Sequence, residues 1–588
     1  MEKQFTKENV IDALYLLSID TNHAADSYLH SFQKSHQVWM IASELLAHRP
    51  NYPLHILTFA AISLAKKTKE DFHLLSMSDL SYLKEELIQN LVNAAMIPES
   101  NSLVVQLGIC LSALGLMAPV LLDELDDFMR QLSGRPEYVM ALLEVLRILP
   151  EEARSSALQR KVECLASVHE QLRLQSSNVL NVLEGFLERQ DLPDTCLLKC
   201  LRVFGSWTRY GFILTDQVLE RKLFQRAQAI LVDPLIEGHL EAADCVVAML
   251  EHSLVRKDLD SRLFEMVISL EPAFQRSVGN QQLLQNYCHI FVNLFETHFQ
   301  LTKRNPAKIQ ERFLTIELLL LIAVHCPLSV IESSMDMWSL LSADLDYKAD
   351  PEMTSSYRPY FLRLLKILFT ITRVPESCED MALPGPMDRF RGLVAEVLVD
   401  VAHLVELDTM QELYDIVEHE QSAWTDVEMA MFFLLNLMRN FKRHQEQLIL
   451  SILESVKDRR QPLIRLQILE LISTPGVVDP GTIFNCLLKE LRQEVPMLAR
   501  IVCRLSLLMP HWSYLLTLAL SVDEFRLKES DRSDLLESVC SLVRQLGPSC
   551  VLEANKYLVN ERRNCEGSGT RQNRIHMIQI HLSFERDT

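Results

Sequence analysis

Two cysteines four residues apart are the first side chains in this sequence whose types and spacing could bind a metal ion. Cys196 and Cys200 fall in a predicted helix, where this spacing places both thiols on one face. A structural zinc site needs four such ligands, and no second pair of cysteines or histidines lies near these two in the sequence. We therefore expect no metal site.

A thiol beside an imidazole is the second candidate, because a cysteine with a neighbouring base can act as a nucleophile. Cys288 and His289 are adjacent in a predicted helix, so their side chains point about 100° apart and cannot readily share a proton. His169-Glu170 and His419-Glu420 each lack the second histidine of a zinc-protease helix. The chain also has no glycine-rich phosphate loop. We expect no catalytic residues, no cofactor and no enzyme activity.

The elements that would position side chains are predicted to be helices throughout. Prolines near positions 50, 98, 150, 193, 234, 272 and 306 divide the first half into segments, most of them the length of a helix pair. Glycine is rare, with 15 among 588 residues, and strand alternation is hard to find. The expected fold is all-α, an α-solenoid of antiparallel helix pairs, which presents long surfaces to partners instead of enclosing a substrate.

Three stretches lack the helical apolar pattern. Residues 344–356 and 373–388 are polar or proline-rich and are predicted to be loops between helices. Residues 559–588 carry no apolar face typical of a helix, and they do not look like the polar capping repeat that ends a solenoid. We predict that this last segment is an irregular C-terminal tail.

The formal net charge of −20 favours basic partners and opposes phosphate backbones and anionic lipid, so we expect no direct nucleic-acid or membrane binding. The acidic run at 123–127 would attract basic partners from a concave surface, or would otherwise be a solvated helix face. Thirteen scattered cysteines indicate a reducing compartment, and the N-terminus has no apolar signal core. An intracellular protein is expected.

Several segments follow one another in a specific order. Glu8–Tyr15, Ala24–Phe32 and Trp39 resemble the first repeat of importin-β-type transport receptors. Further segments narrow the resemblance to the transportin-SR (transportin-3-like) and importin-13 branch of these karyopherins: Leu142–Glu152, Val203–Trp207, Ala243–Val246, Asn286–Phe291, Phe295–Thr297 and Phe390-Arg391 followed by Val394–Val405.

This resemblance implies a HEAT-repeat superhelix that works as a nuclear import receptor. Such a receptor binds cargo, here Ser/Arg-rich splicing factors, in the cytoplasm and releases it in the nucleus on binding Ran-GTP, while Phe-Gly nucleoporins bind outside as it shuttles through the nuclear pore. Residues 1–150 would be N-terminal repeats with the Ran-binding region, and 151–558 the central, exportin-1-like HEAT repeats. By position, the resemblance assigns Lys66 and Lys67 to the contact with Ran.

The resemblance also implies a longer chain, because family members carry an Arg-rich helix for phosphorylated Ser/Arg cargo in their C-terminal third. Arg562, Arg563, Arg571 and Arg574 do not form one helical stripe in this sequence, so we expect a C-terminally shortened form that lacks this source of Arg–phosphate recognition. The alternative interpretation is a HEAT-repeat scaffold or regulatory subunit without a transport cycle.

Overall fold

The computed structural model describes residues 5–19, 23–47, 52–97, 99–117, 125–155, 165–214, 218–233, 235–377, 383–438, 445–456, 459, 461–472, 479–491, 508, 511–522, 529–564 and 569–583. Every regular element in these ranges is helical, which confirms the all-α prediction. The chain divides into two compact units, Met1–Val330 and Ile331–Thr588.

The first unit consists of helices joined by short turns. Its elements are α1 (Lys7–Ile19), α2 (His23–Lys34), α3 (Val38–Ala47), α4 (Leu54–Asp71), η2 (Phe72–Leu74), α5 (Met77–Ala95), α6 (Asn101–Met117), α8 (Leu125–Ser133), α9 (Pro136–Arg154), α11 (Leu165–Leu187), α12 (Thr195–Arg209), α13 (Lys222–Val232), α14 (His239–Arg256), α15 (Ser261–Ile268), α16 (Glu271–Arg276), α17 (Gln281–Thr302), η4 (Pro306–Lys308), and α18 (Ile309–His325) followed by α19 (Leu328–Ile331), whose last residue begins the second unit.

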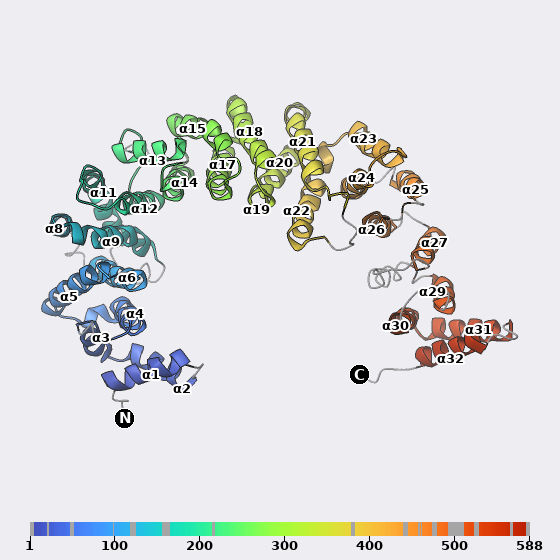
Figure 1. The fold of residues 1–588 in the computed structure, drawn as a ribbon, viewed down its shortest axis with the longest axis horizontal. Helices are drawn as coiled ribbons and strands as arrows, with labels where there is room; N and C mark the ends of the chain where they lie inside the picture. Colours follow the sequence, from blue (N-terminus) through green and yellow to red (C-terminus); the bar gives the residue numbers. More distant parts are fainter. Residues whose placement is uncertain are drawn as a thin grey trace. The chain divides into compact units, whose positions relative to one another are not determined.

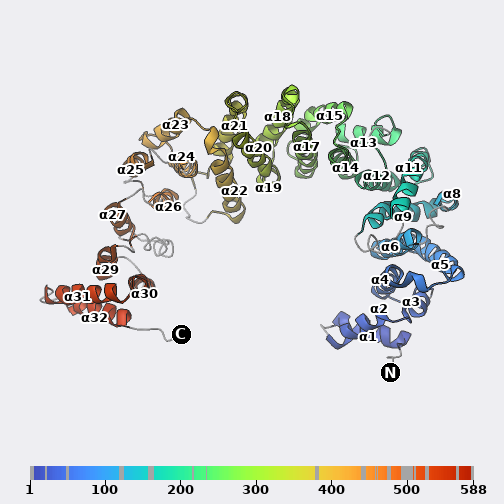
Figure 2. The ribbon, with the colours of Figure 1, turned by 180° about the vertical axis from the view of Figure 1, so that it is seen from behind.

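These helices stack in two rows (Figure 1, Figure 2). In what we call the first row, α4 packs on α6, α6 on α9, α9 on α12, α12 on α14 and α14 on α17. The second row consists of α5, α8, α11 and α13, which pack on the first-row helices next to them in the chain. A first-row helix is therefore covered on several sides, and the consecutive residues Cys245, Val246, Val247 and Ala248 of α14 are accordingly all buried although they point in different directions.

A proline inside α9 is tied to the next first-row helix. Pro150 lies within α9 and has no N–H to donate to the carbonyl oxygen of Leu146, four residues earlier. The indole Nε1 of Trp207, on α12, donates to that oxygen at 2.7 Å, and the hydroxyl of Ser206 donates to the carbonyl of Arg147 at 2.7 Å. The buried carbonyl released by the proline thus anchors α12 on α9.

The second unit continues with stacked helices. Its elements are η5 (Glu332–Ser334), α20 (Met335–Lys348), α21 (Pro351–Ile371), α22 (Gly385–Val401), η6 (Ala402–Leu404), α23 (Leu407–Glu418), α24 (Trp424–Leu437), α25 (Gln445–Val456), α26 (Pro462–Leu471), α27 (Pro480–Leu491), α29 (Trp512–Leu520), α30 (Glu529–Gln545), α31 (Pro548–Asn564) and α32 (Gly569–Ser583). Within it α20 packs on α22, α22 on α24 and α24 on α26, and α23 packs on α24 and α25.

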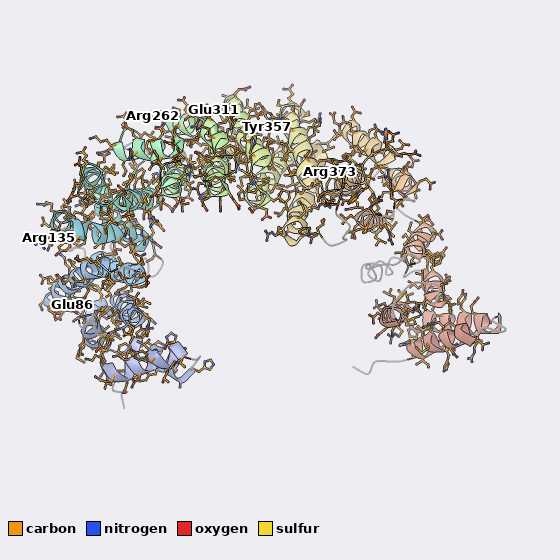
Figure 3. All side chains as sticks on the ribbon, in the orientation of Figure 1. Glu86, Arg135, Arg262, Glu311, Tyr357 and Arg373 are labelled. Atoms are coloured by element: carbon orange, nitrogen blue, oxygen red, sulfur yellow. The ribbon has the colours of Figure 1, made fainter. Side chains whose placement is uncertain are left out.

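A buried ion pair joins α22 to α24. Arg391 donates to both carboxylate oxygens of Glu428, at 2.8 and 3.0 Å, and also to the carbonyl oxygen of Thr372. Both side chains are almost fully buried, which a charge tolerates only when it is paired in this way. Near this pair Arg373, labelled in Figure 3, bonds the hydroxyl of Thr425 and pairs with a carboxylate on α24.

The loop predicted over 344–356 is wrong. Residues 344–348 are the last turn of α20, and α21 begins at Pro351. The Asp350 side chain accepts hydrogen bonds from the backbone N–H groups of Glu352 and Met353, so the Asp-Pro pair is a helix start rather than part of a loop. In the other stretch, residues 378–382 lie outside the described part and α22 begins at Gly385.

The irregular tail predicted over 559–588 is also wrong where the structure describes it. α31 reaches Asn564 and α32 spans Gly569–Ser583, while residues 565–568 and 584–588 lie outside the described part. Ile575, Ile578 and Leu582 are buried at helical spacing, so an apolar face does exist here. The functional boundaries at 150/151 and 558/559 remain predictions; residues 150 and 151 themselves lie within α9.

Candidate interaction surfaces

The two lysines assigned by resemblance lie side by side in the sequence on α4 but in different environments. Lys67 is 2% exposed; its ammonium donates to the carbonyl oxygen of Lys34, in the last turn of α2, at 3.0 Å, and pairs with Asp71 at 2.5 Å. It therefore closes the end of α2, where a cation is favoured. Lys66 is half-buried and donates to the Gln33 amide oxygen at 3.3 Å. The contact of either lysine with Ran remains a prediction.

An exposed apolar surface precedes Lys66 on the same helix. Leu54 and Ile62 of α4 are 37% and 38% exposed, and they line a hollow of about 480 Å³ with His55, Thr58, Phe59 and, from α6, Ser102. The Tyr15 ring, from α1, packs edge-on against His55. We call Tyr15, Leu54, His55 and Ile62 the N-terminal patch. Contiguous exposed apolar side chains of this kind mark binding surfaces.

A second surface is a polar groove across four first-row helices. It has a volume of about 590 Å³ and is lined by residues of α6, α9, α12 and α14, together with Tyr210. Its charged lining residues are Glu144, Arg147, Glu151, Lys199, Arg202, Arg209, Glu241 and Asp244, and we call it the charged groove.

Ion pairs occupy all four basic side chains of the charged groove. Arg147 bonds Glu144 at 2.7 Å, with Glu151 3.8 Å away, and the ammonium of Lys199 lies 3.6 Å from Glu144. Arg202 bonds Glu241 at 2.7 Å, and Arg209 bonds Glu251, beside the groove, at 2.9 Å. The pairs of Lys199, Arg202 and Arg209 link α12 to α9 and α14, whereas Arg147 pairs within α9.

One carboxylate of the groove stands apart from these pairs. The Asp244 side chain makes no ion pair or hydrogen bond with the residues that the structure describes. It is half-buried, and burial raises the pKa of its carboxyl group, although Arg209 and His289 act in the opposite direction. The nearby Glu241 and Glu251 raise the pKa further. Asp244 is thus a partly dehydrated carboxylate that forms no ion pair with a described residue, although the Arg209 charge acts on it.

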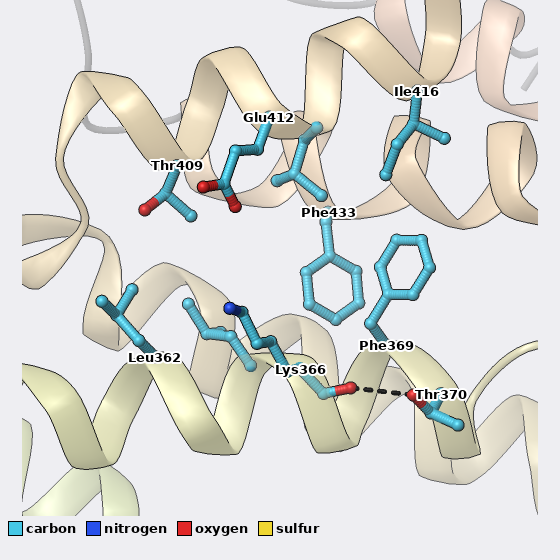
Figure 4. Close-up of a pocket in the computed structure, with 10 residues that line it drawn as sticks. Leu362, Lys366, Phe369, Thr370, Thr409, Glu412, Ile416 and Phe433 are labelled. Atoms are coloured by element: carbon cyan, nitrogen blue, oxygen red, sulfur yellow. Dashed lines mark hydrogen bonds between the residues drawn. The ribbon is translucent and has the colours of Figure 1, made fainter.

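The third surface is an apolar groove in the second unit, shown in Figure 4. It has a volume of about 350 Å³ and lies among α21, α23 and α24, lined by Leu362, Leu365, Lys366, Phe369, Thr370, Thr409, Glu412, Leu413, Ile416 and Phe433. The rings of Phe369 and Phe433 meet edge to face with centroids 5.4 Å apart. Lys366 and Glu412 lie on opposite walls (Figure 4). We call this the apolar groove.

The three cysteines considered for metal binding and nucleophilic chemistry are packed into the helix core. Cys196 and Cys200 are both buried on α12, and a hydrogen bond between the two thiols lowers the pKa of Cys196 and raises that of Cys200. Cys288 is buried whereas His289 is exposed, so these two side chains face different surroundings. Within the described ranges, no group of three histidine, cysteine or acidic side chains could hold a metal ion, and no helix is long and apolar enough to cross a membrane.

Comparison with known proteins finds similarity to importin-13 and to transportins. Residues 100–246 match the family model for Exportin 1-like protein, and residues 280–370 match that for the Transportin-3/Importin-13 second TPR domain. Importin-13 of Mus musculus is 24% identical over 466 residues, which cover 73% of this chain and 47% of the relative. Transportin MOS14 of Arabidopsis thaliana is 22% identical over 459 residues, covering 72% and 46%. The chain is a homologue of the importin-13 and transportin proteins.

A solved structure agrees with this relationship at the level of the fold. Importin 13 in its cytosolic state aligns with a TM-score of 0.59 at 14% identity, over 90% of this chain and 66% of that chain. The HEAT-repeat solenoid predicted from the sequence is thereby confirmed. The chain spans about half the length of the curated relatives it matches.

The matched regions include the charged groove and one wall of the apolar groove. All residues that line the charged groove fall between Asn101 and Asp244, inside the Exportin 1-like match. The α21 wall of the apolar groove, from Leu362 to Thr370, lies inside the Transportin-3/Importin-13 match. The charged groove of this importin-13 homologue therefore lies wholly on a matched segment, and the apolar groove lies on one in part.

Neither groove could be recognised from the sequence. The charged groove gathers side chains from helices that are tens of residues apart, and no local spacing rule connects Glu144, Lys199 and Glu241. The acidic run at 123–127 was the local signal instead, and its residues 123 and 124 lie outside the described part. Of the rest, Asp126 accepts from Asn178 and Asp127 pairs with Arg130, as in a solvated helix face.

Proposed function

We propose that this protein is a nuclear import receptor, which binds cargo in the cytoplasm and releases it in the nucleus when Ran-GTP binds. The observation that carries the proposal is the homology with importin-13 and the transportins over 73% of the chain, on the same stacked-helix fold. No catalytic step is part of the proposed function, because a transport receptor acts by binding alone. Residence in both cytoplasm and nucleus follows from such a cycle.

We propose the N-terminal patch as the contact with Ran-GTP. The patch is apolar and exposed, and Lys66 lies one helical turn beyond Ile62 on the same face of α4. Lys67 is buried and paired within the chain, so Lys66 is the better placed of the two to reach a partner. Ran-GTP and cargo would then be linked by negative coupling, as release requires.

The apolar groove is our proposed site for Phe-Gly nucleoporins. A phenylalanine ring entering the groove would meet Phe369 and Phe433, whose edge-to-face packing a third ring can extend. Lys366 and Glu412 are exposed beside it and could bond the polar backbone of an extended peptide. Replacing Phe369 with alanine should reduce retention on Phe-Gly repeats, whereas Tyr347→Ala, an exposed aromatic residue of the same unit outside the groove, should not.

The central experiment is a pull-down of the purified chain with Ran loaded with GTP or GDP. The proposal expects strong binding of the GTP form only, and Ile62→Asp should abolish it. Leu174→Asp is the matched control, because Leu174 is an exposed apolar residue of the same unit outside the patch. Equal or absent binding of both nucleotide forms by the unmodified chain would overturn the proposal and favour a scaffold or regulatory subunit.

The cargo is proposed to be a Ser/Arg-rich protein, as the transportin-SR relationship implies. Incubation of a preformed complex between the chain and such a cargo with Ran-GTP should release the cargo, and Ran-GDP should not. Retention of the cargo under both conditions would mean that the chain binds this cargo without the Ran-dependent release that transport requires.

A further inference from the structure

The charged groove has a chemical preference that follows from its internal pairing. Its four basic side chains are all engaged with carboxylates of the chain, as described above. An incoming phosphate would have to displace one of those carboxylates to gain a cation. An incoming cation finds Asp244, whose carboxylate forms no ion pair with a described residue. The groove therefore favours positive over negative ligands, although it contains as many basic as acidic lining residues.

The geometry also favours arginine over lysine. Glu241 is almost fully buried, accepts from Arg202, and lies one helical turn from Asp244 on α14, so both carboxylates lie on the same face. A guanidinium offers a planar fork of donors that can bond such carboxylates in pairs, and it loses less hydration on entering than an ammonium does. Tyr210 provides an aromatic ring in the same lining, on which a guanidinium can stack.

We propose that the charged groove binds an extended arginine-rich segment of a partner protein, with guanidinium groups pairing with Asp244 and competing with Arg202 for Glu241. Phosphorylation of serines beside those arginines weakens the interaction, because the phosphates neutralise the guanidinium groups and are repelled by the groove carboxylates. This inference rests on the proposed function, because it takes the partner to be a cargo. It holds that the groove recognises the arginine side chains of that cargo and not its phosphates.

The test measures binding of a fluorescein-labelled peptide of four Arg-Ser repeats to the full chain by fluorescence anisotropy, without Ran. The unmodified chain should bind the unphosphorylated peptide more tightly than the serine-phosphorylated one, and binding should weaken with added salt. Asp244→Asn should lower the affinity about tenfold, as expected for loss of one charged hydrogen-bonded pair. Glu188→Gln is the control, because it removes an equal charge from an exposed pair with Lys222 outside the groove.

A second variant should bind the peptide more tightly, a result that a damaged fold could not produce. Arg202 is half-exposed and competes for Glu241, so Arg202→Gln releases that carboxylate for the peptide and should tighten binding about threefold to tenfold. Weaker binding by Arg202→Gln, unchanged binding by Asp244→Asn, or a preference for the phosphorylated peptide would each overturn the inference. Because Ran is absent from this assay, a failure of nucleotide-dependent Ran binding leaves its outcome unaffected, and the two proposals fail separately.

Discussion

Replacing Trp207 with phenylalanine tests whether the indole compensates for the proline in α9. The change removes the donor that reaches the buried carbonyl oxygen of Leu146 at 2.7 Å, and Pro150 has no N–H that could take its place. A buried acceptor left without a partner costs about 1–3 kcal/mol. The smaller ring adds a packing cost, because Trp207 is fully buried.

A double-mutant cycle separates these two costs. Pro150→Ala restores a backbone N–H that can bond Leu146 in the ordinary helical pattern. In that background Trp207→Phe should lose only its packing, so its cost should fall by about 1–2 kcal/mol, while the change in ring volume is the same in both backgrounds. The difference between the two costs is the free energy of the indole hydrogen bond.

Hydrogen exchange is the suitable assay because a long stack of repeats does not unfold in one cooperative step. Peptides from α9 and α12, followed by mass spectrometry, report the local opening free energy, and about 1.4 kcal/mol corresponds to a tenfold faster exchange. Trp338→Phe is the matched control: Trp338 is also fully buried, but its indole N–H has no partner among the described residues. Equal costs of Trp207→Phe with and without Pro150 would refute the reasoning.

Three further changes test the packing of charged groups. Arg391→Met should lower the local opening free energy of α22 and α24, measured by hydrogen exchange, by roughly 3–5 kcal/mol, because it leaves Glu428 buried and unpaired. The double variant Arg391→Met/Glu428→Leu should recover much of this loss, and a double variant as unstable as the single would contradict the prediction. Burial lowers the pKa of His239 to about 4, so the folded chain stays neutral there while the unfolded chain protonates near pH 6.5. Stability should therefore fall by about 3 kcal/mol as the pH drops from about 6.5 to 4. His239→Asn should reduce this dependence of stability on pH, and an unchanged dependence would exclude His239 as its source. Lys67→Met should lower stability by about 1–3 kcal/mol and Lys66→Met by less than about 0.5, and equal effects of the two would contradict their assigned environments.

The helical stack was predictable because its signals are local. Apolar residues at helical spacing and prolines at helix starts, such as Pro136 of α9, appear within one or two turns of the sequence. The wrong loop prediction also came from a local signal. Asp350-Pro351 carries the same polar and proline signals as a loop, and the cap is evident only when the Asp350 side chain is found bonding the next backbone N–H groups.

The interaction surfaces could not be predicted in the same way. Which face of a helix is exposed depends on its neighbours in the stack, as Lys66 and Lys67 show: they are adjacent in sequence, yet Lys67 is buried because the end of α2 lies against it. The family resemblance pointed to this region of α4 but could not distinguish these two lysines. That distinction depends on the packing of α2 against α4, which is a tertiary contact.

The same principle explains why the charged groove can select a ligand. Its carboxylates lie on α9 and α14, and α12 between them is fixed to α9 by the bonds from Ser206 and Trp207 and to α14 by the bond from Cys245 to the carbonyl of Leu201. These buried contacts hold the helices that carry Glu144 and Asp244 at a set spacing before any partner arrives. A preorganised arrangement loses little conformational entropy on binding, so charge placement, rather than the net charge of the chain, can decide the affinity.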